Sequence, residues 1–326
     1  MAPASPLFTL ASMETDRARV EEALRHAVRT RDPYLTELAS HLIVAGGKRL
    51  RPVTAMAAAL TAASAVSDDV VQGAVSVELV HLGSLYHDDV MDEADTRRGV
   101  ETVNAKWGNL QAILAGDFLL SRASEIAASL GTEIAALLAQ TIGRLCYGQI
   151  GELRRTYSTT RTEAEYLDSI EGKTASLFAT AARTGGIVAG AEREQIEVLT
   201  RYGHAFGMVF QIVDDVLDLT ATEAQLGKPA GHDLVEGVYT LPVIRILAAG
   251  GPAAAELEDL LGRPLGPAEC DKALAIVRSN GAVAEAVAVG SEYAALADEA
   301  CHDLPRSAAT DALRAAPRAL LGTLPV

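Results

Sequence analysis

The sequence HLGSLYHDDVMD at residues 81–92 has a counterpart in GMVFQIVDDVLD at residues 207–218. In each stretch, aspartates at positions i, i+1 and i+4 follow an apolar run. On a helix, this spacing places the first and last carboxylates on one face, with the middle one close beside them. Like charges in apolar surroundings are unfavourable unless a cation neutralises them. A solvated acidic face is the alternative for one such triplet, but it does not explain why the arrangement occurs twice.

The chemistry of the two triplets indicates the kind of cation. Carboxylates without matching Cys or His ligands favour a hard, oxygen-seeking ion such as Mg²⁺. Such an ion usually takes one or two carboxylates, and waters and substrate phosphates complete its coordination. The predicted metal ligands are Asp88, Asp89, Asp92, Asp214, Asp215 and Asp218.

The rest of the chain has a helical pattern. Apolar residues recur every three or four positions between short segments that contain Gly, Pro or Asp, and no stretch predicts a strand. Start signals precede several of these stretches, including Ser67, the pair Thr162 and Glu165, and Pro267. We expect helices at 15–30, 33–43, 50–64, 67–94, 104–129, 132–154, 162–170, 173–188, 191–221, 233–249, 266–279, 281–303 and 307–321. Residues 250–267 are expected to form a loop. The fold class is therefore predicted to be all-α, with residues 1–326 forming a single domain.

Composition excludes several classes of protein. The chain has 326 residues, a formal net charge of -15 and a hydrophobic content of 49%, which is enough to form a large core. Its acidity disfavours nucleic acid as a partner. Cys146, Cys270 and Cys301 are too widely spaced for a disulfide framework or a CxxC metal pair. Without a signal peptide or an apolar run of about 18 residues, we expect a cytoplasmic protein with no stable membrane insertion.

Basic residues gather in two short motifs. GGKRLRP at residues 46–52 contains Lys48, Arg49 and Arg51, and TRRG at residues 96–99 contains Arg97 and Arg98. Arginine forks fit phosphate oxygens, and glycine permits close approach of the backbone. Either motif alone has an ordinary interpretation as surface charge. Together with the acidic triplets, they predict a substrate that carries a diphosphate and binds with Mg²⁺.

An ordered series of motifs resembles the trans-isoprenyl (polyprenyl) diphosphate synthases, in particular the bacterial long-chain enzymes. The motifs are GGKRLRP at 46–52, HLGSLYHDDVMDEADTRRG at 81–99, GKTASLF at 172–178, FQIVDDVLDL at 210–219 and GKPAGHDLVEGVYTLP at 227–242. The resemblance implies a single large helical bundle of the isoprenoid synthase type with a central active-site cavity. It also implies that the two acidic motifs face each other, that up to three Mg²⁺ ions bind, and that the protein is a homodimer.

The resemblance also assigns roles to individual residues. Those matching contacts to isopentenyl diphosphate are Lys48, Arg51, His81 and Arg98, with Arg49 in the same motif. Those matching contacts to the allylic diphosphate are Arg97, Lys173 and Lys228, and Asp233 follows as the family pattern expects. Lys173, Thr174 and Gln211 form the expected catalytic set. Val238 departs from the pattern, because the family often has Lys there.

The implied reaction joins isopentenyl diphosphate to an allylic diphosphate by ionisation, condensation and elimination. Gly83 and Ser84, about one turn before Asp88, are small, whereas bulky residues near these positions close the tunnel in family members that make short products. A long-chain all-trans polyprenyl diphosphate is therefore expected, although the two residues can also serve only close helix packing.

Several alternatives remain open at this stage. They are a geranylgeranyl or shorter-chain diphosphate synthase, a terpene cyclase, a regulatory subunit and a di-iron protein. The di-iron interpretation rests on two ExxH segments, which end at His81 and His302. It leaves both acidic triplets unexplained.

Overall fold

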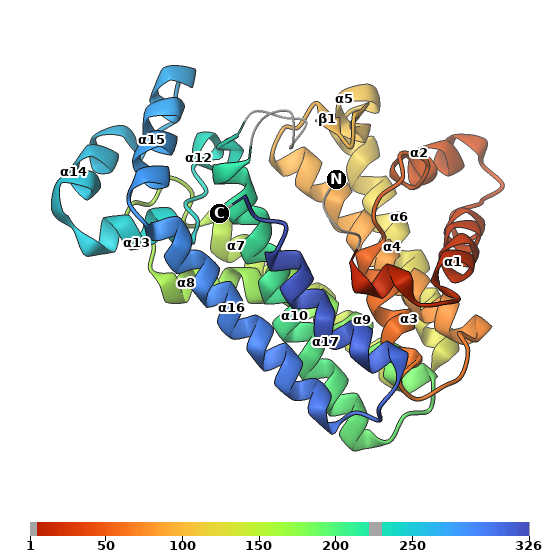
Figure 1. Ribbon diagram of the computed structural model, residues 1–326. Coiled ribbons are helices and arrows are strands. Elements are labelled where there is room, and N and C mark those ends of the chain that lie inside the picture. Colours follow the sequence, from red (N-terminus) through yellow and green to blue (C-terminus); the bar gives the residue numbers. More distant parts are fainter. Residues whose placement is uncertain (1–4, 222–229, 326) are drawn as a thin grey trace.

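The computed structural model describes residues 5–221 and 230–325, and helices form nearly all of the regular structure (Figure 1). The first half contains η1 (Pro6–Thr9), α1 (Met13–Ala27), α2 (Pro33–Val44), α3 (Leu50–Ala59), α4 (Asp68–Met91), β1 (Thr96–Arg97), β2 (Val100–Glu101), α5 (Val103–Trp107), α6 (Asn109–Leu130) and α7 (Thr132–Leu153). The second half contains α8 (Glu163–Ile170), η2 (Glu171–Ala175), α9 (Ser176–Val188), α10 (Arg193–Thr220), α12 (His232–Glu236), α13 (Leu241–Ala249), α14 (Gly251–Leu260), α15 (Pro267–Ser279), α16 (Ala282–Ala300), η3 (Cys301–Asp303) and α17 (Ala308–Leu321).

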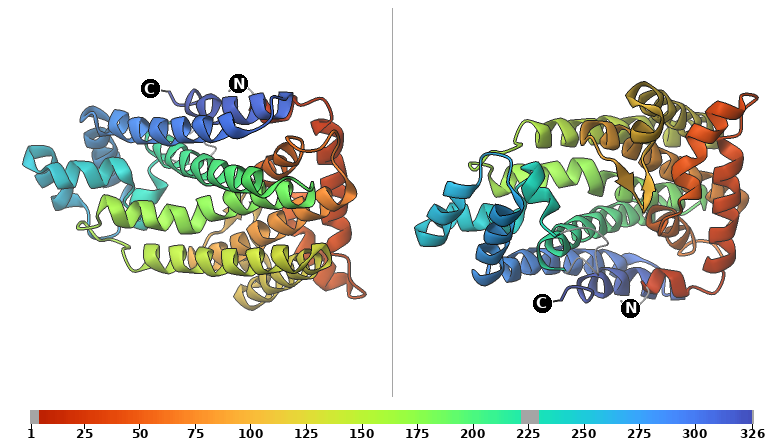
Figure 2. Two further views of the ribbon diagram at one scale, coloured as in Figure 1. Left: turned by 90° about the horizontal axis from the view of Figure 1, so that it is seen from below. Right: turned by 90° about the horizontal axis from the view of Figure 1, so that it is seen from above.

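The long helices lie side by side, with α1 and α2 at one end of the bundle and α14 and α15 at the other (Figure 2). Helix α10 joins the two parts of the core. Tyr202 and Phe206 belong to a cluster with α1 to α4, α6 and α9, whereas Val209 and Ile212 belong to one with α13 to α16. The all-α prediction is therefore confirmed, and the second acidic triplet lies on a helix that is buried along most of its length.

Close contact between α9 and α10 fixes the position of this helix. A Cβ atom at Gly207 would lie 2.6 Å from Ala175 Cα, and one at Gly203 would lie 2.6 Å from the Phe178 carbonyl oxygen. Only glycine permits this approach, because both contacts are to backbone atoms that cannot rotate away. The packing therefore sets the height of Asp214 and Asp215 relative to the residues of η2.

Several predicted helix starts are confirmed. The Ser67 hydroxyl accepts a hydrogen bond from the Val70 N–H at 3.2 Å, and Thr162 and Glu165 form a reciprocal capping box. Pro267 opens α15. Each feature satisfies a helix end or fits its geometry, as expected from the sequence.

Other predicted boundaries are wrong. The expected helix at 104–129 is broken at Gly108, where φ is +97°, and the one at 233–249 is broken at Gly237, where φ is +76°. The expected loop at 250–267 contains α14. A strand pair occurs where none was predicted, because Arg98 and Gly99 both adopt positive φ and turn β1 back onto β2.

Helix η2 is a π-helical turn between α8 and α9. It carries Lys173 and Thr174, two of the predicted catalytic residues. π-helical turns are rare in proteins, and those that occur are often found at functional sites. The irregular turn thus marks this segment as part of the candidate site.

Among the described residues, no single helix is long and apolar enough to cross a membrane. One pair of consecutive helical segments, Pro267–Ser279 and Ala282–Asp303, meets the same criterion of length and composition, with a bend of 64° between them.

Candidate active site

The two acidic triplets come together although 126 positions separate them. Asp88 and Asp92 on α4 and Asp214 and Asp215 on α10 line one cavity of about 470 Å³. Arg97, Arg98, Lys173 and Asp233 line the same cavity. The predicted meeting of the two motifs thus holds for four of the six aspartates.

The other two aspartates have different surroundings. Asp89 is buried and forms an ion pair with Arg97, so it holds a cation of the cavity wall in place. Asp218 is also buried and accepts a hydrogen bond from the backbone N–H of Asp233 at 3.2 Å. Their role as metal ligands stays a prediction.

The electrostatics of this cavity favour a bound cation. Burial raises the pKa of Asp88, and burial together with nearby Glu236 raises the pKa of Asp92 to about 6. Burial also raises the pKa of Asp215 to about 7. A cation in the cavity would favour the charged carboxylates and reverse these shifts.

The donor set fits Mg²⁺ bound together with a substrate. No group of three or more His, Cys, Asp or Glu side chains in the described ranges is arranged to hold a metal ion by itself. Mg²⁺ rarely uses a complete protein cage, and one or two carboxylates from each helix suffice when substrate phosphate and water supply the other ligands. Asp88, Asp92 and Asp214 are placed to act in this way.

Thr174 and Gln211 form part of a hydrogen-bonded chain beside the second triplet. The Thr174 hydroxyl donates to Gln211 Oε1 at 2.6 Å, and Gln211 Nε2 donates to Asp215 Oδ1 at 2.7 Å. The Tyr166 hydroxyl donates to the other Asp215 oxygen at 2.6 Å. Tyr166 was missed by sequence reasoning, because a tyrosine within a helical pattern has no signal that separates it from core residues.

Lys173 Nζ contacts Glu152 on α7 at 2.6 Å. Burial alone would lower the pKa of Lys173, but Glu152 and Asp88 outweigh it and raise the pKa. The side chain is therefore a permanent cation in the cavity wall. Glu152 was also missed, since it belongs to no motif.

A second, basic cavity of about 340 Å³ adjoins the first. Its lining includes Lys48, Arg49, Arg51, His81 and Arg98, which are five of the predicted substrate-binding residues. Burial lowers the pKa of Arg51 to about 10, which still leaves it charged at neutral pH. Burial, with Arg51 and Arg98 beside it, lowers the pKa of His81 well below its usual range. His81 is thus a neutral hydrogen-bonding group among cations.

The structure corrects the assignment of Arg49. Its side chain is buried, with Nε 2.6 Å from Glu21 and Nη1 3.1 Å from Glu78, and Nη2 donates to the Ile43 carbonyl at 3.0 Å. Nearly all of its donors are therefore occupied by protein acceptors. Arg49 shapes the loop that carries Lys48, and its guanidinium is not free to bind phosphate.

An apolar cavity of about 490 Å³ connects the acidic and basic cavities. It shares Asp88, Lys173 and Asp214 with the first and Arg51 and His81 with the second. The three spaces thus form one site, with charged groups at two of its boundaries and an apolar wall that includes Leu85, Leu145 and Phe210.

Ser84 and Gly83 differ in where they face. Ser84 lines the apolar cavity. A Cβ atom at Gly83 would instead lie 3.1 Å from the Gly116 carbonyl oxygen and 3.2 Å from Leu120 Cγ, both on α6. The packing interpretation therefore describes Gly83, and of the two residues only Ser84 lines the cavity.

Five residues of the 227–242 motif line the acidic cavity, namely His232, Asp233, Glu236, Val238 and Thr240. Val238 therefore occupies the wall of the predicted phosphate site, as its place in the motif indicated. Lys228 lies outside the described residues.

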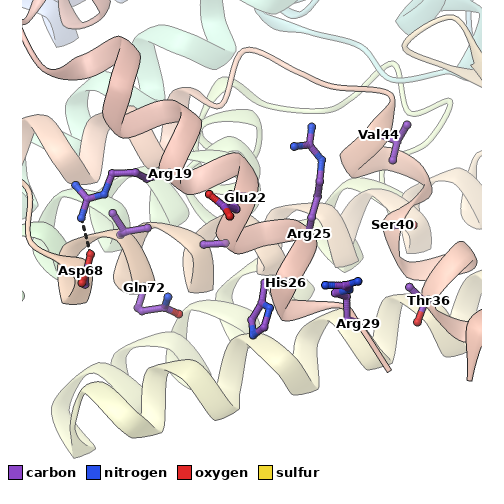
Figure 3. A pocket seen from close by; sticks show the side chains of 12 residues that line it. Arg19, Glu22, Arg25, His26, Arg29, Thr36, Ser40, Val44, Asp68 and Gln72 are labelled. Atoms are coloured by element: carbon purple, nitrogen blue, oxygen red, sulfur yellow. Dashed lines mark hydrogen bonds and ion pairs between the residues drawn. The ribbon is translucent and has the colours of Figure 1, made fainter. Parts of the chain in front are cut away.

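A separate cavity of about 790 Å³ lies between α1, α2 and the start of α4 (Figure 3). Arg19 and Asp68 pair there at 2.7 Å, and Arg25, His26 and Arg29 also line it. None of the predicted site residues that the structure describes forms part of its wall. Its size alone therefore does not make it the candidate site.

We expect Arg49→Ala to lower the free energy of unfolding by about 3–5 kcal/mol, because it leaves Glu78 buried without its partner. Urea denaturation followed by circular dichroism measures this loss. Lys48→Ala is the matched control, since Lys48 is exposed, and its effect should stay within about 0.5 kcal/mol. An unchanged stability of the Arg49 variant would contradict the assigned role.

Comparisons with known proteins agree with this site. The polyprenyl synthetase family model matches residues 32–277. The chain is 41% identical over 296 residues to a nonaprenyl diphosphate synthase of Mycobacterium tuberculosis, which covers 90% of this chain and 87% of that protein. It is 39% identical over 303 residues to heptaprenyl diphosphate synthase component 2 of Geobacillus stearothermophilus, with coverage of 93% and 94%.

Solved structures show the same likeness. The crystal structure of a polyprenyl synthase from Caulobacter crescentus CB15, complexed with calcium and isoprenyl diphosphate, matches with a TM-score of 0.90 and 34% identity. The match covers 97% of this chain and 96% of that one. The family model spans most of the chain and both relatives align over nearly their whole length, so this protein belongs to the polyprenyl synthetase family.

Proposed function

We propose that the protein is a Mg²⁺-dependent prenyltransferase that condenses isopentenyl diphosphate with an allylic diphosphate and yields a long-chain all-trans polyprenyl diphosphate. The observation that carries the proposal is the meeting of three spaces: an acidic cavity, a basic cavity and an apolar cavity that shares residues with both. Two phosphorylated substrates can thus bind with their hydrocarbon parts in contact.

The reaction begins when the C–O bond of the allylic diphosphate breaks and the diphosphate leaves with the bonding electrons. Mg²⁺, up to three ions, supplies positive charge that stabilises the leaving group when it is bound. Lys173 adds a fixed cation from the protein, and Thr174 and Gln211 present oxygen atoms near the developing carbocation. The apolar wall keeps water away from the cation.

Condensation follows within the same site. The basic cavity holds the diphosphate of isopentenyl diphosphate through Lys48, Arg51 and Arg98, with neutral His81 as a hydrogen-bonding partner. The double bond of this substrate attacks the allylic cation, and loss of a proton to the released diphosphate completes the step. Orientation of the two substrates replaces a rare encounter in solution.

The alternatives are less well supported. A terpene cyclase has no need of a second diphosphate pocket, which the basic cavity provides. A geranylgeranyl or shorter-chain synthase would need a bulky group in the apolar cavity near Asp88, where Ser84 lies. The small side chain of Ser84 at this position therefore supports the long-chain product.

We also propose a homodimer that forms through α6 and α7. Leu110 and Leu114 on α6 are 74% and 66% exposed, and Tyr147 and Ile150 on α7 are 66% and 57% exposed. Large apolar side chains gathered on neighbouring helices are typical of an interface. We propose further that the chain forms a single domain and is located in the cytoplasm. The free thiols of all three cysteines fit a reducing compartment such as the cytoplasm.

Asp88→Asn and Asp214→Asn should each lower turnover by about 10²–10³-fold, because each removes one carboxylate placed to hold Mg²⁺ against the leaving group. Incorporation of labelled isopentenyl diphosphate measures turnover, and circular dichroism checks the fold. Asp69→Asn, at the exposed start of the same helix α4, is the control. Full activity of either site variant would exclude the metal-binding role.

Ser84→Phe should shorten the product by at least one five-carbon unit, because an aromatic ring would fill part of the apolar cavity. Chromatography of the extracted products measures chain length. Gly83→Ala serves as the neighbouring control, since its new methyl group meets α6, so product length should be unchanged while thermal stability falls. The opposite pattern in the two variants would refute this assignment.

Leu114→Glu and Tyr147→Glu should shift the protein from dimer toward monomer, because each places a charge in the proposed apolar interface. Sedimentation equilibrium measures the mass, with 34.1 kDa expected for one chain. Leu296→Glu on α16 is the control, since Leu296 is 54% exposed on a different helix. A monomeric wild-type protein would rule out the dimer.

A further inference from the structure

Arg161, just before α8, has an unusual environment for a charged side chain. It is only 5% exposed, and burial lowers its pKa although the nearby carboxylates of Glu152 and Asp215 oppose that shift. Nη1 donates to the Tyr239 carbonyl at 3.1 Å, and the guanidinium lies 5.5 Å from the centre of the Tyr166 ring. Nε and Nη2 have no hydrogen-bond partner within the described part of the chain.

A structural role accounts for only part of this arrangement. One carbonyl and one aromatic ring satisfy a single nitrogen and part of the charge, whereas buried donors without partners are costly. An apolar side chain of similar length would fill the same space without that cost. The unpartnered donors therefore point to a ligand that is present when the protein works.

The position of Arg161 identifies the kind of ligand. Arg161 lines the acidic cavity together with Asp88, Asp214 and Lys173. The other cations of this wall already contact protein acceptors, because Lys173 lies 2.6 Å from Glu152, Arg97 pairs with Asp89, and Arg98 donates to the Leu42 carbonyl at 3.3 Å. Among the described guanidiniums of this wall, Arg161 is the one whose remaining donors, Nε and Nη2, are buried without a partner.

Val238 lies in the same wall. Arg161 is tied to this segment through the carbonyl of Tyr239, the next residue in the chain. An aliphatic side chain at 238 adds no positive charge to a part of the wall that already holds the carboxylates of Asp233 and Glu236. Arg161 is the cation held beside it.

We infer that Arg161 is a further binding residue for the allylic diphosphate and supplies positive charge on the Val238 side of the cavity. The inference rests on the proposed function. Binding of the diphosphate would bring phosphate oxygens to the Nε and Nη2 donors and satisfy them. Bidentate contact of this kind is what a guanidinium offers and an ammonium does not.

The test compares Arg161→Met with the wild-type protein. The Met variant should keep the thermal stability of the wild type or exceed it, because it removes unpartnered buried donors. Its KM for farnesyl diphosphate should rise about tenfold or more, while its KM for isopentenyl diphosphate stays within about twofold. Inorganic diphosphate should also become a weaker competitive inhibitor against farnesyl diphosphate.

A second variant provides the rescue. Val238→Lys added to Arg161→Met places a new cation in the same wall and should recover most of the lost affinity for farnesyl diphosphate. An unchanged KM in the Met variant, equal losses for both substrates, or a Met variant that fails to fold would overturn the inference. An inactive wild-type protein would instead refute the proposed function, so the two failures are distinguishable.

Discussion

The placement of carboxylates from α4 and α10 in one partly buried cavity is the constraint on which the rest of the structure depends. Asp88, Asp92, Asp214 and Asp215 face one cavity, and burial raises the pKa of three of them. The fold brings them together because α10 lies in close contact with α9 and is buried along most of its length. Lys173, Arg97 and Arg98 bring positive charge to the same wall, and a bound cation would further favour the charged form of the carboxylates.

In the basic cavity, a protein carboxylate offsets part of the positive charge. Glu78 is a buried carboxylate among cations, and its contact with Arg49 anchors the loop between α2 and α3 to the core. Arg51 and Arg98 line this cavity, and burial keeps His81 neutral beside them. The two cavities thus differ in charge, since carboxylates predominate in the first and basic side chains in the second.

Much of this arrangement could be predicted from the sequence, because it depends on local patterns. Helical periodicity located most helices, and the repeated triplets identified both acidic segments that line the cavity. The residue assignments that were wrong depend on tertiary contacts. The guanidinium of Arg49 is a group that commonly binds phosphate, but here it forms ion pairs with Glu21 and Glu78. Gly83 faces α6, which spacing along α4 cannot reveal.

The residues missed altogether share a physical reason. Tyr166, Glu152 and Arg161 belong to no motif and reach the site because α7 and α8 pack against each other and against η2, which contacts α10. The turn at Arg98 and Gly99 was missed because a single glycine after two arginines is a weak signal for a strand pair.

The most direct measurement is the length of the product made by the wild-type protein from farnesyl diphosphate, labelled isopentenyl diphosphate and Mg²⁺. The account predicts elongation that depends on Mg²⁺ and continues beyond geranylgeranyl diphosphate, because Ser84 leaves the apolar cavity open. A product that stops at geranylgeranyl diphosphate would contradict the long-chain assignment. The absence of any elongation would contradict the central claim that the three cavities form one prenyltransferase site.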